Sequence, residues 1–260
     1  MSAGALILNA DDFGKDRNTT DRILDCFERS ALSSTSAMVF MEDSERAAAL
    51  ARNRGIDAGL HLNLTERFSQ PGAPERLREH QERVALSLRR HRLRQVLYDA
   101  RLSKSFDYVV QAQIEEFTRI YQIEPRRIDG HHHMHLCANV LYTKLLPEGA
   151  IVRRSFSFAA SEKGLINRMY RRLVDMRLAR RHRMTDFFYS LPPIDAPGRL
   201  ARIFNLAKNF VVEVETHPAR SNEYAFLTSG DIFRVAAGVP VARHYVVPGG
   251  PASLTTEPAL

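Results

Sequence analysis

Short apolar runs alternate along the chain with segments in which apolar residues recur at helical spacing. The run at 5–10 (ALILNA) is almost entirely apolar, as expected for a parallel strand covered on both faces. Further strands are predicted at 36–40, 58–64, 127–130, 150–153, 210–216 and 245–247. Helices are predicted from Asn18 or Thr19 onward, at 44–53, and through Phe106, Val110, Ile114, Phe117 and Tyr121. This alternation predicts a parallel sheet with covering helices, either a barrel or an open doubly wound fold.

Length and composition fit one globular domain. The chain has 260 residues, of which 44% are hydrophobic and 26% charged. One domain is therefore expected over 1–248, with a basic insertion around 70–105, and residues 249–260 are expected to form a mobile tail. No run reaches the roughly 18 apolar residues that a membrane helix needs, and the start of the chain lacks a leader pattern. Cys26 and Cys137 fit no paired spacing, so two free thiols in the cytoplasm are expected.

The net charge of +7 is concentrated in two segments. Residues 76–104 carry nine Lys or Arg against three acidic residues, and residues 168–183 carry seven Arg against Asp175 alone. One interpretation is attraction to a polyanion or to an acidic membrane surface. The preferred one is two solvated helices with Leu and Val inward and Arg outward, because neither segment matches a nucleic-acid-binding module. No nucleic-acid partner is therefore expected.

Carboxylates and imidazoles follow several of the predicted strands. Asp11 and Asp12 end the first strand, His61 lies within the third, and DGHHHMH at 129–135 and His217 follow two later strands. Each has a plainer explanation: a helix cap, a core histidine or a surface loop. Together they supply the parts of a mononuclear hydrolytic centre, with imidazole and carboxylate ligands, a base and an acid. Because parallel sheets place their sites beyond the carboxyl ends of the strands, we expect these side chains to converge.

Four motifs in this order resemble one known family. NADDFG at 9–14, GLHLNL at 59–64, DGHHHMH at 129–135 and THP at 216–218 are similar to the motifs of the YdjC-like carbohydrate deacetylases, also called the ChbG/HpnK family. The resemblance implies an α/β fold, a distorted (β/α) TIM-like barrel of the glycoside hydrolase/deacetylase type. It also implies metal-dependent removal of an acetyl group from an N-acetylated sugar.

The same resemblance implies roles for individual residues. Asp12, His61 and His131 would be ligands of one divalent metal ion, Asp11 the catalytic base and His217 the general acid. Arg153 resembles the basic residue that the family places near its site. Zn²⁺ suits two imidazoles and a carboxylate, with Co²⁺ or Mg²⁺ as alternatives. Supporting or substrate-contacting roles are expected for the remaining polar side chains of the motif, which are Asp129, His132, His133 and His135.

Two other functional interpretations stay open. One is a different metallohydrolase on the same scaffold, such as a phosphoesterase. The other is a non-catalytic protein that binds a polyanion through the arginine-rich segments; it would survive loss of Asp11 and His131 but not loss of the arginines. For the deacetylase, an acidic or lipid-linked sugar would fit the charge of the basic segments. A homodimer is the default assembly.

Overall fold

Strands and helices alternate along the chain, as the sequence predicts. The computed structural model of the chain describes residues 4–91, 93–158, 162–236 and 238–248, so the predicted mobile tail at 249–260 lies outside the described residues. In chain order the elements are β1 (Ala5–Phe13), α1 (Arg17–Glu28), β2 (Ser34–Ala37), α2 (Ser44–Arg54), β3 (Ala58–Leu62), α3 (Glu75–Arg90), α4 (Leu93–Val96), η1 (Ala100–Leu102), α5 (Ser103–Tyr121), β4 (Arg127–Gly130), η2 (His131–Leu136), α6 (Ala138–Thr143), β5 (Ile151–Val152), α7 (Leu165–Leu178), β6 (Phe187–Ser190), α8 (Arg199–Leu206), β7 (Val211–Thr216), α9 (Ser221–Thr228) and α10 (Asp231–Ala236).

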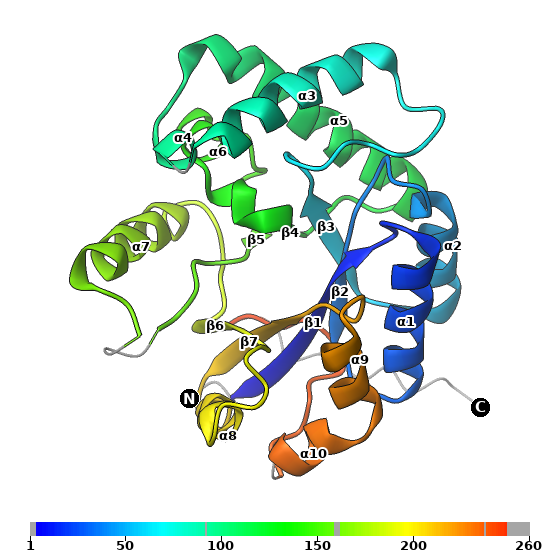
Figure 1. Cartoon of the computed structure of the whole chain (residues 1–260), viewed down its shortest axis with the longest axis vertical. Helices are drawn as coiled ribbons and strands as arrows, with labels where there is room; N and C mark the ends of the chain where they lie inside the picture. Colours follow the sequence, from blue (N-terminus) through cyan, green and yellow to red (C-terminus); the bar gives the residue numbers. More distant parts are fainter. Residues whose placement is uncertain (1–3, 92, 159–161, 237, 249–260) are drawn as a thin grey trace.

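The seven strands form one parallel sheet in the order β5-β4-β3-β2-β1-β7-β6. The sheet curls into a half-barrel whose edges are β5 and β6, with helices around its outside (Figure 1). This confirms the predicted distorted α/β barrel in a single domain. Within the described ranges, no helix combines the length and the apolar character that crossing a lipid bilayer requires.

Strand β1 lies inside the sheet and begins with a continuous apolar run. β1 lies between β2 and β7, and Leu6, Ile7 and Leu8 on it are fully buried. Neighbours on both faces explain why the run is continuously apolar rather than alternating. Each such side chain contributes about 1.5–3 kcal/mol of transfer free energy on burial. The core therefore fixes β1, and with it the polar residues at its carboxyl end.

The basic segment at 76–104 packs onto the barrel through its apolar side. It folds into α3, α4 and η1, and α3 runs alongside α5 (Figure 1). Leu77, Val84 and Leu88 of α3 are buried, as are Phe106 and Phe117 of α5. The predicted arrangement, with apolar side chains inward and arginines outward, is therefore correct for α3.

Helix α7 contradicts the same expectation. It extends away from the sheet at the left of Figure 1. Among its apolar residues only Val174 and Leu178 are buried. Six large apolar side chains are exposed: Leu165, Ile166, Met169, Tyr170, Leu173 and Met176. The amphipathic pattern correctly predicts a helix. The prediction that its apolar side faces the protein is wrong.

Two strand predictions need correction, and one strand was not predicted. The strand expected at 36–40 is β2, which lies at Ser34–Ala37 because its polar residues are buried against β1 and β3. The segment at 245–247 is no strand; the Tyr245 backbone N–H donates to the Asp57 carboxylate instead of to a ladder. An unpredicted strand, β6, pairs with β7. Its sequence, FFYS, is a short aromatic run that favours a strand.

Candidate metal centre

The end of β1 turns two neighbouring carboxylates in different directions. Asp12 has φ 72°, in the left-handed region, and the pairing of β1 with β2 shifts register at the same place. A non-glycine residue in that region costs on the order of 1–3 kcal/mol, which the surrounding fold must offset. As a result Asp12 faces His61 and His131, whereas Asp11 faces Arg153.

Asp12, His61 and His131 converge as the sequence predicts. Oδ1 of Asp12 lies 3.3 Å from Nε2 of His61 and 2.9 Å from Nδ1 of His131. One ligand atom from each residue lies within 4.8 Å of the others, and all three residues are buried. Despite these short separations, Asp12 Oδ1 accepts no hydrogen bond of good geometry from the described residues. A buried carboxylate oxygen facing two imidazole nitrogens without being hydrogen-bonded fits a divalent metal ion.

The imidazoles of His61 and His131 each contact a second carboxylate through the ring nitrogen that points away from Asp12. Nδ1 of His61 lies 2.8 Å from Asp129 Oδ1, and Nε2 of His131 lies 3.0 Å from Glu66 Oε2. With the proton on the nitrogen that faces each carboxylate, the other nitrogen presents a lone pair toward Asp12. This carboxylate–imidazole arrangement is the usual support of metal-binding histidines. The contact of Asp129 is with His61 on β3, not with a histidine of its own motif.

The charges around the two imidazoles attract a cation. Burial lowers the pKa of His61, but Asp11, Asp129 and Asp12 together raise it to about 10. Burial likewise lowers the pKa of His131, and the partners Asp12 and Glu66 outweigh it so that the pKa rises. The pocket therefore favours positive charge at these imidazoles, which a bound metal ion can supply in place of protons.

Asp11 is held by a bidentate ion pair. Arg153 donates from Nη1 to Oδ2 of Asp11 at 2.7 Å and from Nη2 to Oδ1 at 2.8 Å. Asn9 donates a third hydrogen bond to Oδ1 at 2.8 Å. Burial raises the pKa of Asp11, but Arg153 and His61 outweigh it, so the pKa falls below its usual range. Asp11 is therefore an ionised, fixed carboxylate.

Arg153 is the centre of a buried ionic network. Its side chain is 1% exposed, and besides Asp11 it contacts Asp129 at 2.9 Å, Glu213 at 2.7 Å and Glu215 at 3.5 Å. One guanidinium cannot balance four carboxylates. Burial and the charge of Asp11 raise the pKa of Glu215 well above its ordinary value, so protonation of this carboxyl is favoured in the folded protein.

His217 follows β7, close to the same cluster. Its backbone N–H donates to Glu223 at 2.8 Å, and its Nδ1 is buried without a hydrogen bond among the described residues. Burial lowers the pKa of His217, only partly opposed by the charges of Asp11 and Asp12. The neutral imidazole thus stands near the two aspartates with one nitrogen uncommitted.

The other histidines of the DGHHHMH motif have separate environments. His132 Nδ1 lies 3.0 Å from Thr65 Oγ1, and His135 Nε2 lies 3.0 Å from the Arg153 carbonyl oxygen. His133 packs edge-on against Phe156, with ring centroids 4.5 Å apart. His132 and His133 have φ of 54° and 59°, and this left-handed turn sends successive imidazoles in different directions.

Sequence reasoning assigned no role at the site to Glu66, Lys15, Glu213 or Glu215. Lys15 pairs with Glu66 at 2.7 Å, and Glu66 supports His131. The sequence signal for Glu213 and Glu215 is the alternation of valine and glutamate in VEVET, which places both glutamates on the same side of the strand. Buried on a central strand, both residues face Arg153 rather than solvent.

Comparison with known proteins relates the chain to one family. The model of the family described as YdjC-like protein matches residues 5–237. A chitooligosaccharide deacetylase of Serratia marcescens is 32% identical over 132 residues, which is 50% of each chain. A carbohydrate deacetylase of Vibrio parahaemolyticus is 28% identical over 236 residues, 86% of this chain and 82% of the relative. The chain thus matches about half the length of the Serratia relative and most of the Vibrio one.

A solved structure supports the fold. The crystal structure of a candidate cellobiose-phosphate cleavage protein of Enterococcus faecalis V583 superimposes with a TM-score of 0.67 at 20% sequence identity. The superposition covers 93% of this chain and 97% of that one. The half-barrel is therefore common to both proteins along nearly their whole length. With the family model matching most of its residues, the chain belongs to the YdjC-like protein family.

Proposed function

We propose that the chain hydrolyses the acetyl amide of an N-acetylated sugar, such as an N-acetylglucosamine-type oligosaccharide or glycoconjugate, with the help of one divalent metal ion. The observation that carries this proposal is the convergence of Asp12, His61 and His131 beside the fixed carboxylate of Asp11. The names of the Serratia and Vibrio relatives supply the reaction and the substrate class.

The metal ion would be held by Asp12 Oδ1, His61 Nε2 and His131 Nδ1. When bound, a divalent cation lowers the pKa of water and polarises an amide carbonyl. The two imidazoles favour Zn²⁺ over Mg²⁺, with Co²⁺ as a further alternative. Asp129 and Glu66 would keep the two imidazoles in the tautomers that the ion needs.

Asp11 would accept the proton that the attacking water loses. Its lowered pKa keeps the carboxylate ionised, and Arg153 prevents it from turning away. Arg153 is thus a positioning residue, because the contacts that define it are with Asp11, Asp129 and Glu213. A fixed carboxylate needs little reorganisation when the reaction begins.

His217 would deliver a proton to the departing nitrogen. Water oxygen adds to the acetyl carbon, the carbon–nitrogen bond breaks, and the products are acetate and a free amine. An amine leaves readily only when protonated. Because burial lowers the pKa of His217, its protonated form is a strong donor once it has taken up a proton.

The two cysteines support a cytoplasmic location. Cys26 and Cys137 are both free and buried. Unpaired buried thiols fit the reducing cytoplasm, which is where we expect the reaction to take place.

Acetate release tests the proposal. Purified protein would be given neutral, acidic and lipid-linked N-acetylated sugars, with and without a chelator and then with Zn²⁺, Co²⁺ or Mg²⁺ restored. We expect release that the chelator abolishes and the metal restores, and a fall of about 10³-fold or more in Asp11→Asn.

One control variant and two possible outcomes separate failure of the reaction from failure of the site. Asp231→Asn alters a partly exposed carboxylate on α10 that pairs with Arg234, and this variant should match the unaltered protein. Metal bound at one ion per chain with no acetate from any sugar would contradict the deacetylase and direct attention to phosphoesters. Acetate release that is insensitive to chelator and to Asp11→Asn would contradict the proposed site.

A further inference from the structure

Helix α7 presents a stripe of large apolar side chains to solvent. Ile166 is 86% exposed, Leu165 68%, Leu173 63%, Met169 56% and Met176 53%. Ile166, Met169, Leu173 and Met176 follow one another at helical spacing, so they share one face. An exposed apolar surface of this extent marks a binding face rather than ordinary surface.

The stripe continues onto neighbouring elements. Tyr142 of α6 is 59% exposed, and its ring lies 6.3 Å from the ring of Tyr98, which is 48% exposed. The guanidinium of Arg177 on α7 lies 4.5 Å from the Tyr142 ring. Figure 1 shows α4, α6 and α7 along the same side of the molecule. We call the exposed apolar residues of α7, together with Tyr98 and Tyr142, the α7 face.

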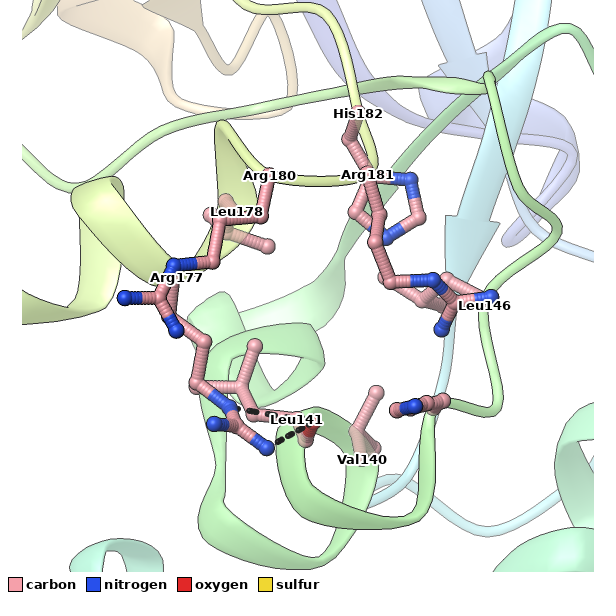
Figure 2. Close-up of a pocket in the computed structure, with 9 residues that line it drawn as sticks. Val140, Leu141, Leu146, Arg177, Leu178, Arg180, Arg181 and His182 are labelled. Carbon is pink, nitrogen blue, oxygen red and sulfur yellow. Dashed lines mark hydrogen bonds between the residues drawn. The ribbon is translucent and has the colours of Figure 1, made fainter.

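A basic pocket lies beside the α7 face. A cavity of about 400 Å³ between α6 and α7 has apolar walls that include Val140, Leu146 and Leu178. Lys144, Arg177, Arg180 and Arg181 also line it. Figure 2 shows Arg177 and Arg180 on one side of the cavity and Arg181 and His182 on the other.

Little negative charge opposes these cations. Arg181 pairs with Glu148 at 3.5 Å, but Glu148 is 75% exposed. Arg177 donates to the carbonyl oxygen of Leu141 and lies over the Tyr142 ring, and neither partner carries a negative charge. The cavity therefore suits an anion, and a phosphate group is matched especially well by several guanidinium groups.

We propose that the α7 face and the basic pocket together dock the protein on a membrane surface that carries anionic phospholipids. The apolar stripe would enter the boundary between headgroups and acyl chains, and a headgroup phosphate would occupy the pocket. A helix with an apolar face and arginines beside it is the usual form of an interfacial membrane helix. Residues 168–183 hold seven arginines against one aspartate, which complements the negative surface potential of such a membrane.

Two other partners for the α7 face, a second copy of the chain and a nucleic acid, fit it less well. In a symmetric dimer through this face, each arginine-rich helix would lie against its own copy, so like charges would meet. A nucleic acid would satisfy the arginines, but its phosphate backbone would leave Leu165, Ile166 and Leu173 in water. An anionic lipid surface accounts for the charge and for the apolar side chains together.

Vesicle binding tests the proposal and does not depend on the proposed deacetylation. The full chain would be sedimented with vesicles of phosphatidylcholine alone and of phosphatidylcholine mixed with phosphatidylglycerol. We expect binding to the anionic vesicles to be about tenfold stronger or more, and to weaken as salt is raised. Ile166→Ser with Leu173→Ser, and separately Arg180→Gln with Arg181→Gln, should each lower it about tenfold.

Matched variants on other elements control for loss of apolar surface and of charge. Ile123→Ser removes a side chain that is 56% exposed, and Lys208→Gln with Arg243→Gln removes two exposed cations. Both control proteins should bind anionic vesicles normally, and all variants should keep the unaltered circular dichroism and release acetate from a soluble sugar unchanged.

Several results would overturn the docking surface. These are equal binding to both vesicle types, binding unaffected by either α7 variant, or a dimer in light scattering that disappears with Ile166→Ser and Leu173→Ser. Tighter binding of DNA or RNA than of anionic vesicles would also overturn it, as would soluble glycerol 3-phosphate binding as tightly as the vesicles. Acetate release from a soluble sugar would report separately on the proposed function.

Discussion

Arg153 donates to both carboxylate oxygens of Asp11, at 2.7 and 2.8 Å, and to Glu213 through its remaining Nε–H at 2.7 Å. This contact joins β1, β7 and the segment that follows β5. It ties the carboxylate proposed as the base to the most buried ion pair of the barrel. The same guanidinium thus serves both the stability of the fold and the geometry of the site.

Loss of that guanidinium should destabilise the protein strongly. Arg153→Met leaves Asp11, Asp129 and Glu213 buried without their shared cation, so we expect the free energy of unfolding to fall by about 3–5 kcal/mol. Arg153→Lys retains the charge but not the bidentate geometry, and should lose less stability. Urea unfolding measures both variants, and an Arg153→Met protein within about 1 kcal/mol of the original would contradict the network.

Asp129 should control metal affinity through His61. Asp129→Asn removes the carboxylate 2.8 Å from Nδ1 of His61, and an amide no longer fixes the tautomer. We expect metal affinity to weaken about 10–100-fold, measured by competition with a metallochromic chelator. Asp231→Asn on α10 is the matched control and should bind metal normally. Unchanged affinity in Asp129→Asn would show that His61 needs no such support.

Glu215 should make the folded protein less stable as pH rises. Its pKa is raised well above the ordinary value in the folded state, whereas the unfolded chain loses this proton near its ordinary pKa of about 4.3. The stabilisation is therefore complete below the unfolded pKa and is lost as pH climbs toward the folded pKa. Glu215→Gln should gain stability relative to the original protein between pH 5 and pH 8. The difference in unfolding free energy between Glu215→Gln and the original protein should grow with pH. A difference that stays constant or shrinks as pH rises would contradict the raised pKa of Glu215.

Both cysteine thiols should be unreactive until the protein unfolds. Burial raises the pKa of Cys26 and of Cys137 to about 12, and their exposures are 0% and 3%. A thiol-reactive chromophore at pH 8 should therefore label no cysteine in the folded protein and both in denaturant. Rapid labelling of the folded protein would contradict the buried environment.

The sequence predicts that Asp12, His61 and His131 converge because they lie at or near the carboxyl ends of strands of one parallel sheet. Their proposed role as metal ligands comes from the resemblance to the YdjC-like family. This prediction does not require the strand order. In any all-parallel sheet the carboxyl ends of the strands that carry Asp12, His61 and His131 lie at one rim. Glu66 could not be found in the same way. It lies in the irregular segment after β3, and only the folded loop carries its carboxylate to within 3.0 Å of His131.

Helix α7 shows a different limit. Periodicity indicates that residues 165–178 form an amphipathic helix, but it does not state what the apolar face contacts. The sequence interpretation placed that face inward. In the structure Val174 and Leu178 alone among its apolar residues pack inward, and Ile166 is 86% exposed. The direction of such a face depends on tertiary packing, which no local pattern encodes.

Metal titration with activity as the readout tests the central claim most directly. Metal-free protein would receive increasing Zn²⁺ while acetate release from an N-acetylated sugar is recorded, beside Asp12→Asn. We predict that activity rises from the metal-free baseline and saturates at one ion per chain, and that Asp12→Asn neither binds the ion nor releases acetate. Full turnover by the metal-free protein, or by Asp12→Asn, would contradict a metal-dependent deacetylase built on Asp12, His61 and His131.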